Sequence, residues 1–527
     1  RATAVGPQTN SETQPAETQP RDVQSPDRQG ALTTEPAESQ PAPVLSFKLS
    51  DALAYSMKNG RAFQNAKEDL YLAALALTLE RHLWTPRFAA DIKSEFVDWG
   101  EINNFDRAMS AVSQVSVEQK LPTGGTLTAN IVNNLMRDLG RHITSGESGQ
   151  VMIAANIPLL RGAGRAAYET RYQAERNLIY AAREFEAFRR SFLVDIATDF
   201  FRLLSLRSQV ESAIASQEAF AVDVERVRAL AKAERAISVD VDRAEVQYLE
   251  AQNRVVNTQE QFSNALDAFK IRIGMPTETP LEIGDEEIEL HDPRVPEDPA
   301  IETALVYRLD LLNVLDSVDD ARRGVAVAQN HLLPDFNFSG NVSVPTDPAL
   351  KNSVHYNYDR AVWRGMLDLE VPLDRKAERN MYRSSLITQR RAERMLDQTR
   401  EQVRLDVRRA LRRLEQARFS MEIQRRNIEI NEFRRRVARA QFDIGRLTSN
   451  RDVIEAENDL RLAKDSFAEA LSNYRQVILE FLRDTGTLRV DDDGHWVRQS
   501  DLKVSGAPGG TAQEGPLIPD GARDAPQ

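Results

Sequence analysis

Two long stretches of the chain have apolar residues at helical spacing and almost no residue that breaks a helix. From Arg165 to Ile273 there is neither glycine nor proline, and from Leu373 to Thr485 there is no proline and only Gly445. Apolar residues recur there every three or four positions, the period of one helix face. The pattern predicts two helices of about 70 residues, each roughly 100 Å long, and each followed after a tight turn by a helix of about 36 residues.

The first of these stretches should turn near residues 233–239, which separates the long arm from the shorter one. A helix as long as the first arm is stable in water only when it packs along its whole length. The sequence therefore predicts a coiled coil or a helical tube.

Short segments of alternating apolar and polar residues precede each long helix. They cover residues 88–97, 112–132, 151–157, 336–344 and 367–371. The segment 112–132 reads as a hairpin that turns at residues 122–125. Asp368 and Glu370 alternate with leucines, so we expect a sheet with one polar face in contact with water and one apolar face.

The two halves of the chain share motifs in the same order. The matched segments are 52–55 with 304–307, 86–88 with 334–336, 157–168 with 371–382, and 240–274 with 452–486. The third match has an offset of 214 residues and the fourth an offset of 212. A duplication explains this ordered set better than chance. Only the first half contains the hairpin at 112–132, which either adds strands or extends a mouth of the sheet.

This repeat sets the expected organisation of the chain. Each half should consist of a helix of about 36 residues, a strand region, a helix of nearly 70 residues, a tight turn and a second helix of about 36 residues. The predicted units are a disordered proline-rich tail at 1–44, a first repeat at 45–276, a linker at 277–296, a second repeat at 297–490, and a disordered tail at 491–527. Both tails have few large apolar side chains to offset the entropy lost on ordering. The chain begins at Arg1, so we also expect that a segment such as a signal peptide once preceded it.

The composition excludes several classes of function. The 527 residues include 68 Lys+Arg, 80 Asp+Glu and no cysteine, so disulfide scaffolds, thiol catalysis and Cys-ligated metals are excluded. The six histidines form no close ligand pair, and we expect no metal and no cofactor. No window approaches the roughly 18 apolar residues of a transmembrane helix, although barrel strands would not produce one.

Three further signals each have two interpretations. The run from Gly162 to Ala167 fits a dinucleotide-binding fingerprint, but the breaker-free helix that follows favours a strand-to-helix joint. Residues 383–440 hold 17 Arg against 8 acidic residues, which suggests a solvated or intersubunit face rather than a nucleic-acid site. Trp84, Trp99 and Trp363 lie near strands, where they serve either as membrane-interface anchors or as core residues.

Taken together, the motifs resemble the TolC family of outer-membrane efflux proteins. The resemblance rests on the two-fold repeat, on residues 158–164, and on Gly445 followed by residues 452–457, and it covers roughly residues 45–490. It implies a mainly α fold with a smaller β part. A duplicated strand-and-long-helix repeat would form a trimeric α-helical periplasmic tube that continues into an outer-membrane β-barrel.

The resemblance also implies a function. The chain would be the outer-membrane exit duct of a tripartite efflux or type I secretion system, passively passing small molecules or polypeptides from an inner-membrane transporter. Its partners would be two further copies, a periplasmic adaptor (membrane fusion) protein, the transporter and outer-membrane lipid. We expect no nucleic-acid partner and no enzyme activity. The alternative is a soluble coiled-coil scaffold, which explains the helices but not the strands in both halves.

The resemblance assigns site residues at the periplasmic tip of the tube. Asp452 and Glu455 match acidic positions that ring the entrance, where three copies would favour cations. The other interpretation of these two acids is a solvated helix start. Asp240, Arg446 and Phe442 match positions whose polar contacts close the tip, next to the turn at Gly445. Phe442 has no hydroxyl group, so one of those contacts is lost here.

Overall fold

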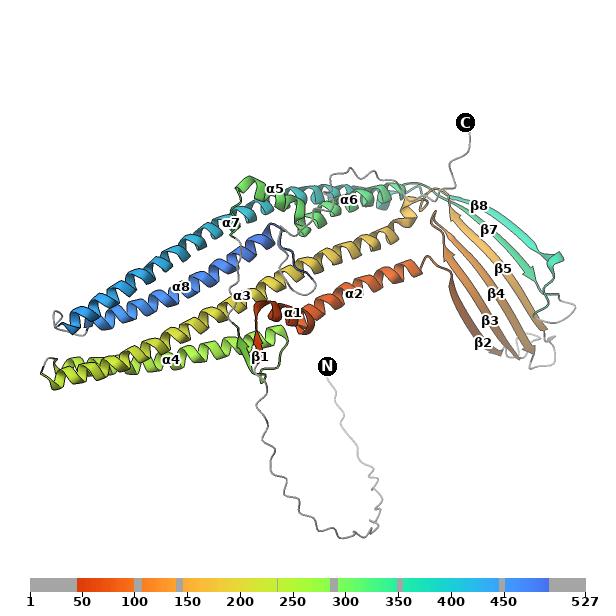
Figure 1. The fold of residues 1–527 in the computed structure, drawn as a ribbon. Coiled ribbons are helices and arrows are strands. Elements are labelled where there is room, and N and C mark those ends of the chain that lie inside the picture. Colours follow the sequence, from red (N-terminus) through yellow and green to blue (C-terminus); the bar gives the residue numbers. More distant parts are fainter. Residues whose placement is uncertain are drawn as a thin grey trace, which may run out of the picture. The chain divides into compact units, whose positions relative to one another are not determined.

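The computed structural model describes residues 45–98, 107–138, 146–234, 236–284, 292–347, 354–444 and 451–491 (Figure 1). The residues outside the described part of the chain include both expected tails, except for Asp491. They also include Trp99, Gly445 and Arg446.

Long helices dominate the described residues, as the breaker-free stretches predict. The helices are α1 (Leu49–Asn59), α2 (Arg61–His82), α3 (Arg165–Lys232), α4 (Ser238–Ile273), α5 (Glu297–Tyr307), α6 (Leu309–Asn330), α7 (Lys376–Asp443) and α8 (Arg451–Asp484). The two longest, α3 and α7, have 68 residues each, and the turn after α3 lies within the predicted interval. None of the described helices is long and apolar enough to cross a membrane.

The first helix of each half is broken in two, which corrects the expectation of one helix of about 36 residues. Gly60 separates α1 from α2 and Arg308 separates α5 from α6, both with extended backbone. A Cβ atom at Gly60 would lie 2.4 Å from the Ser56 carbonyl oxygen, so the chain passes too closely there for another residue. At the second break, the Arg308 guanidinium donates to Asp310 and Asp406.

The four helices of the two long hairpins lie side by side in the order α4, α3, α8, α7 (Figure 1). Apolar clusters join them. One cluster, centred on Phe200, Phe201 and Phe269, fills the space where α1 meets α3 and α4. Near the two helical turns a second cluster, here called the tip cluster, contains Val227, Ala244, Phe442 and Val453 and so joins all four helices. Both turns therefore lie at the same end of this layer.

Two sheets complete the described fold. Strands β1 (Leu45–Phe47) and β6 (Leu281–Ile283) form a small parallel pair beside the helices. The larger sheet contains β2 (Arg87–Asp98), β3 (Arg107–Lys120), β4 (Thr126–Asp138), β5 (Gly146–Pro158), β7 (Asp335–Pro345) and β8 (Val362–Glu370). Its strands are antiparallel and follow each other in that order. The predicted hairpin at 112–132 thus adds β3 and β4 to the sheet.

The turn between β3 and β4 requires glycine. Gly124 and Gly125 have φ angles of 101° and 88°, which disfavour any side chain. A Cβ atom at Gly125 would also lie 2.1 Å from the Asn156 carbonyl oxygen of β5. The Gly pair that predicted the hairpin therefore also allows its turn to pack against the neighbouring strand.

The joint at Gly162–Ala167 connects β5 to α3 and ties it to the second half. The Gly162 N–H donates to Asn330, and Arg161 pairs with Asp335 at 3.2 Å. The dinucleotide interpretation is wrong, because it needs a second parallel strand and the described strands of this sheet are all antiparallel.

Candidate functional site: a two-faced sheet and a helical tip

One face of the large sheet is apolar across all six strands. The register aligns Phe88, Val117, Ala129, Ile153, Val342 and Trp363, so alternate residues of every strand share this face. The face also holds Ile92, Phe96, Val115, Ile131, Leu367 and Leu369, all exposed to solvent. Ile92 is 81% exposed and Trp363 77% exposed. An apolar surface this continuous is costly to leave in water.

The opposite face of the same sheet is polar. Its central strands present Thr128, Asn130, Gln150, Asn156, Ser339 and Asn341, and its outer strands add charged side chains. Strict alternation between an apolar and a polar face suits a sheet that separates lipid from water. Trp363 lies on the apolar face, as a membrane anchor would, whereas Trp84 packs edge-on against Tyr168 like a core residue.

Both edges of this sheet are open within the described chain. β2 pairs only with β3, and β8 pairs only with β7. These edges are 12 and 9 residues long and leave rows of unpaired N–H and C=O groups. In a lipid environment each unpaired group would cost several kcal/mol. The sheet is therefore incomplete as a membrane element without another chain at its edges.

Asp452 and Glu455, the predicted entrance residues, lie in the first turns of α8. Both are exposed, while Val453, Ile454 and Ala456 on the other side of the helix are buried. The two carboxylates thus share one solvent-facing side of the helix, next to the tip cluster. This placement fits either a ring around an entrance or a solvated helix start.

The predicted tip-closing residues have mixed placements. Phe442 is buried in the tip cluster, where an apolar ring replaces a hydroxyl group. Asp240 is also buried, and it accepts a hydrogen bond from Arg243 of its own helix at 3.0 Å. Arg446 and Gly445 lie outside the described residues, so the predicted contact between Arg446 and Asp240 stays a prediction.

A polar network that the sequence did not reveal joins α3 to α6. Arg176 pairs with Asp316 at 3.1 Å and with Asp320 at 3.2 Å, and Arg323 reaches Asp320 at 2.9 Å. The Tyr180 hydroxyl donates to Asp320. Burial works against the charge of Asp320, but hydrogen bonds from Tyr180 and other donors outweigh it and hold its pKa below the ordinary value. The paired residues of α3 and α6 are about 140 positions apart in the sequence, so no local sequence pattern could indicate this network.

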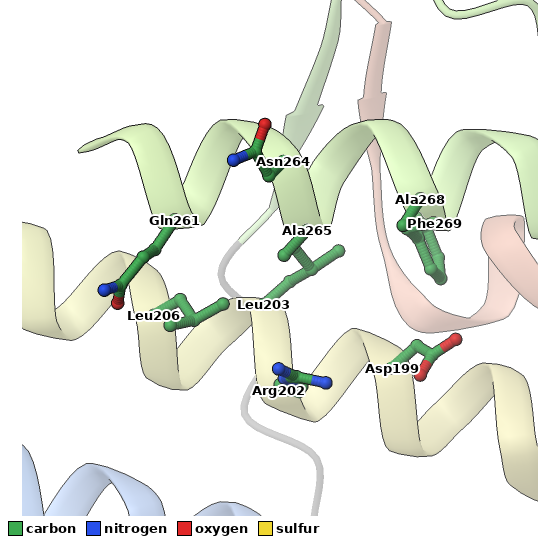
Figure 2. A pocket seen from close by; sticks show the side chains of 9 residues that line it. All are labelled: Asp199, Arg202, Leu203, Leu206, Gln261, Asn264, Ala265, Ala268 and Phe269. Atoms are coloured by element: carbon green, nitrogen blue, oxygen red, sulfur yellow. The ribbon is translucent and has the colours of Figure 1, made fainter. Parts of the chain in front are cut away.

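Each long hairpin carries a groove at an equivalent position. The first lies between α3 and α4, has a volume of about 420 Å³ and is lined by Asp199, Arg202, Leu203, Gln261 and Asn264 with Phe269 (Figure 2). The second, of about 370 Å³, lies between α7 and α8 and is lined by Arg413, Gln416, Ala417, Asn473, Gln476 and Glu480. The helix residues correspond at the same offsets, 214 and 212, as the sequence repeat.

The two grooves differ in charge at three corresponding positions, which are Asp199 and Arg413, Arg202 and Gln416, and Ala268 and Glu480. Asp199 of the first groove receives a hydrogen bond from Arg272 at 2.7 Å, whereas Arg413 occupies its place in the second and lies 4.0 Å from Glu480. Burial is the larger effect on Asp199 and raises the pKa of its carboxyl despite Arg272. The repeat thus preserves the shape of the hairpin and exchanges its surface charges.

The arginine-rich segment of α7 is mostly exposed and partly paired with acids. Arg400 pairs with Asp397 within the helix, and Arg434 pairs with Asp459 of α8 at 2.9 Å. Arg435 lies 3.6 Å from Glu457, which is buried. These contacts agree with the interpretation of a solvated or intersubunit face.

The comparisons with known proteins agree with this fold. Residues 300–482 match the family model described as Outer membrane efflux protein. A comparison with curated proteins gives no match.

Several solved structures share the fold. A solved structure of CusC, which concerns its folding and transmembrane channel formation, has 13% sequence identity to this chain and a TM-score of 0.65. The match covers 88% of this chain and 99% of CusC. The outer membrane protein VceC from Vibrio cholerae has 14% identity and a TM-score of 0.64, with coverages of 83% and 96%. The CmeC outer membrane channel of Campylobacter jejuni has 14% identity and a TM-score of 0.63, with coverages of 83% and 85%.

The family match confirms the resemblance that the sequence motifs indicated, and the shared fold confirms the mainly α architecture with a smaller β part. The match supports a role in efflux and agrees with an outer-membrane location. It also agrees with the expectation that the chain is not an enzyme.

Proposed function

We propose that three copies of this chain, whose second half matches an outer membrane efflux protein domain, form the outer-membrane exit duct of a tripartite efflux or type I secretion system. The observation that carries the proposal is the two-faced sheet with two open edges. Its apolar face contacts lipid, its polar face lines a water-filled passage, and each edge pairs with a neighbouring copy. A closed ring of copies leaves no edge unpaired.

The helical layer also supports association with further copies. Its two outer helices, α4 and α7, expose apolar residues at heptad spacing. On α4 these are Val239, Val246, Leu249 and Val256, and on α7 they are Phe419, Ile423, Ile430 and Phe433, followed by Ile444 directly after the end of the helix. We call them the outer seams. Pairing α4 of one copy with α7 of the next would bury both seams and continue the layer around a tube.

The duct needs partners to move its cargo. In this proposal outward transport is driven by an inner-membrane transporter that connects to the duct through a periplasmic adaptor. The tip, with Asp452 and Glu455 exposed beside the tip cluster, is the end that would meet them. Three copies would place six carboxylates at this entrance and favour cations.

Electron microscopy of detergent-extracted protein tests the proposal. We expect hollow particles with three-fold symmetry and a helical part of roughly 100 Å, as 68 residues at 1.5 Å per residue require. We also expect the protein to need detergent for extraction from the membrane fraction. Solid rods or two-stranded filaments that remain in solution without detergent would favour the coiled-coil scaffold instead.

A further inference from the structure

An exposed leucine lies at each joint between the large sheet and a long helix. Leu159 lies between β5 and α3 and is 44% exposed, and Leu373 lies between β8 and α7 and is 99% exposed. The two positions correspond at the repeat offset of 214. Leu373 also continues the alternation of the exposed Leu369 and Val371. Each joint therefore presents an apolar side chain to solvent where the sheet meets the helices (Figure 1).

Exposed cations follow each leucine in the first turns of the long helix. Arg165 is the first residue of α3, and α7 carries Lys376, Arg379 and Arg383. All four are exposed, and none of their side chains makes a hydrogen bond or ion pair with the described residues. Arg165 and Arg379 correspond in the repeat, again at an offset of 214. An exposed leucine with an exposed arginine six residues later thus occurs in both halves.

The three cations of α7 are unfavourable for the helix itself. Positive charge near a helix N-terminus opposes the helix dipole. Lys376 and Arg379 are three residues apart, and Arg379 and Arg383 are four apart, so like charges are neighbours on the helix surface. No acidic residue lies three or four positions from any of them. Of the acids nearest in sequence, Asp374 accepts from the Lys376 backbone N–H and Glu378 is half-buried. An anion from outside the chain would remove this cost.

Other arginines near these positions are neutralised by acids of the chain. Arg400 and Arg404 of α7 each pair with an acid three residues earlier. At the start of α3, Glu169 lies four residues after Arg165, but it pairs with Arg323 of α6 at 2.9 Å. The cations at the two joints therefore keep their charge exposed to solvent.

We propose that each joint binds an anionic phospholipid, with the cations on its phosphate and the leucine against its acyl chains. This inference rests on the proposed function, in which the apolar face of the sheet contacts lipid. The helical end of the sheet then lies at the boundary of the hydrocarbon, where the lipid headgroups begin. Lys and Arg side chains next to a membrane span attract anionic headgroups there.

The chemistry of the joints fits a lipid better than an acidic protein segment. An exposed leucine between an apolar strand end and a group of cations matches a molecule whose anionic group adjoins hydrocarbon. Arginine guanidinium groups bind phosphate through two parallel hydrogen bonds, and Lys376 adds a compact charge. The α7 joint has three cations and the α3 joint has Arg165, so the α7 joint should bind the lipid more tightly.

Lipid retention by the full chain tests the proposal. Detergent-extracted protein is mixed with equal amounts of phosphatidylglycerol and phosphatidylcholine, and native mass spectrometry counts the lipids that stay bound. We expect at least a threefold preference for phosphatidylglycerol. Lys376→Gln/Arg379→Gln/Arg383→Gln should lower the retained phosphatidylglycerol at least twofold, and the further change Arg165→Gln should lower it at least fivefold in total. No preference in the unmodified chain, or full retention by the fourfold variant, would overturn the proposal.

The matched control is Arg409→Gln/Arg412→Gln/Arg426→Gln. These three arginines are also exposed on α7, and their side chains have no hydrogen-bonding or ion-pair partner among the described residues. The first of them lies about 50 Å further along the helix than Lys376, beyond the reach of the headgroups. The control should retain lipid like the unmodified chain. A loss as large as that of the joint variant would show general attraction to positive charge and contradict a site.

Leu373→Ser distinguishes a bound lipid from a bound phosphate group alone. The side chain is 99% exposed, so the variant should fold normally. Retained phosphatidylglycerol should fall at least twofold, because the acyl chains lose an apolar contact. Unchanged retention would contradict the lipid assignment. Electron microscopy of the same preparations tests the proposed function separately, since hollow three-fold particles without a lipid preference would overturn this inference and leave the duct intact.

Discussion

Single side chains explain how this fold positions α6 on α3. Asp320 receives hydrogen bonds from Tyr180 and Gln173 across the interface between these helices, and one from Arg323 of its own helix. Burial, followed by the hydrogen bond to Asp320, raises the pKa of Tyr180 to about 12. The folded state thus favours the neutral phenol, which can donate to the carboxylate. Hydrogen bonds of this charged kind commonly contribute about 1.5–3 kcal/mol.

Removing the Tyr180 hydroxyl should weaken this interface. We expect Tyr180→Phe to lower the free energy of unfolding by about 1–2 kcal/mol at neutral pH, measured by chemical denaturation. The contribution is fully present below the unfolded pKa of about 10 and is lost as the pH rises through 12. The stability of the wild type should therefore fall more steeply than that of the variant between these values.

Tyr382→Phe is the control for this substitution. The hydroxyl of Tyr382, on α7, makes no hydrogen bond with the described residues, so its loss should leave stability almost unchanged at any pH. Parallel pH profiles for wild type and Tyr180→Phe would show that the bond to Asp320 contributes nothing.

We expect the ion selectivity of the channel to depend on Asp452 and Glu455. The combined variant Asp452→Asn/Glu455→Gln keeps the size of both side chains and removes their charge. If the two acids ring the entrance, channels in planar bilayers should lose most of their preference for cations over anions. An unchanged preference, with normal assembly, would support the solvated helix start. Glu429→Gln, an exposed acid on α7, is the control for general surface charge.

At the scale of elements, the helices follow directly from the local sequence and their packing does not. Both 68-residue helices coincide with the breaker-free stretches. The breaks at Gly60 and Arg308 were missed, and both places contact residues far away in the sequence: a Cβ atom at Gly60 would lie 3.0 Å from the Phe192 ring, and Arg308 donates to Asp406. The sheet strands were found by alternation, but their order required the paired registers of the folded chain.

The outer seam of α7 provides a test of assembly. Phe433 is 61% exposed in the single chain, so Phe433→Asp should leave its folding intact. In the proposed assembly the side chain is buried, and the charge should reduce the trimer association constant at least tenfold, about 1.4 kcal/mol. Sedimentation velocity measures the trimer fraction, and far-ultraviolet circular dichroism checks the helices.

Arg436→Asp is the control for the seam. Arg436 is exposed on the same part of α7 but does not belong to the apolar heptad positions. We expect this variant to assemble normally. A loss of trimer as large as that of Phe433→Asp would mean that the seam has no special role.

At the scale of the whole molecule, the described chain combines a helical layer with a sheet that has one apolar face and one polar face. Ile92, at the middle of β2, and Asn130, in the middle of β4, lie on opposite faces of this sheet. Each half contributes strands to it, and the duplicated order of elements builds both long hairpins. The unit boundaries drawn from the sequence remain a prediction.

A lysine substitution on each face of the sheet tests which face contacts lipid and which contacts water. Ile92→Lys should cost about 2–4 kcal/mol on a lipid-facing side and strongly reduce the amount of protein recovered from the outer membrane. Asn130→Lys, on the polar face, should be recovered like the wild type. The readout is the heat-resistant trimer in membrane extracts. Equal recovery of both variants would argue against lipid contact of the apolar face.

The long helices, the alternating strands, the hairpin at 112–132 and the family resemblance could all be predicted from the sequence. These features depend on local periodicity, on missing helix breakers and on motif order, all of which a single chain displays. Their matching positions also predict Asp452 and Glu455 as entrance residues, and this role stays a prediction.

Contacts between residues far apart in the sequence became apparent only in the folded chain. Folding placed Tyr180 against Asp320, gathered Phe442 into the tip cluster and brought the charges of β2 and β8 to the two open edges of one sheet. Such contacts follow from strand register and helix packing, which depend on the whole chain at once. The physical reason is that burial and pairing are properties of neighbours in space, while periodicity is a property of neighbours in sequence.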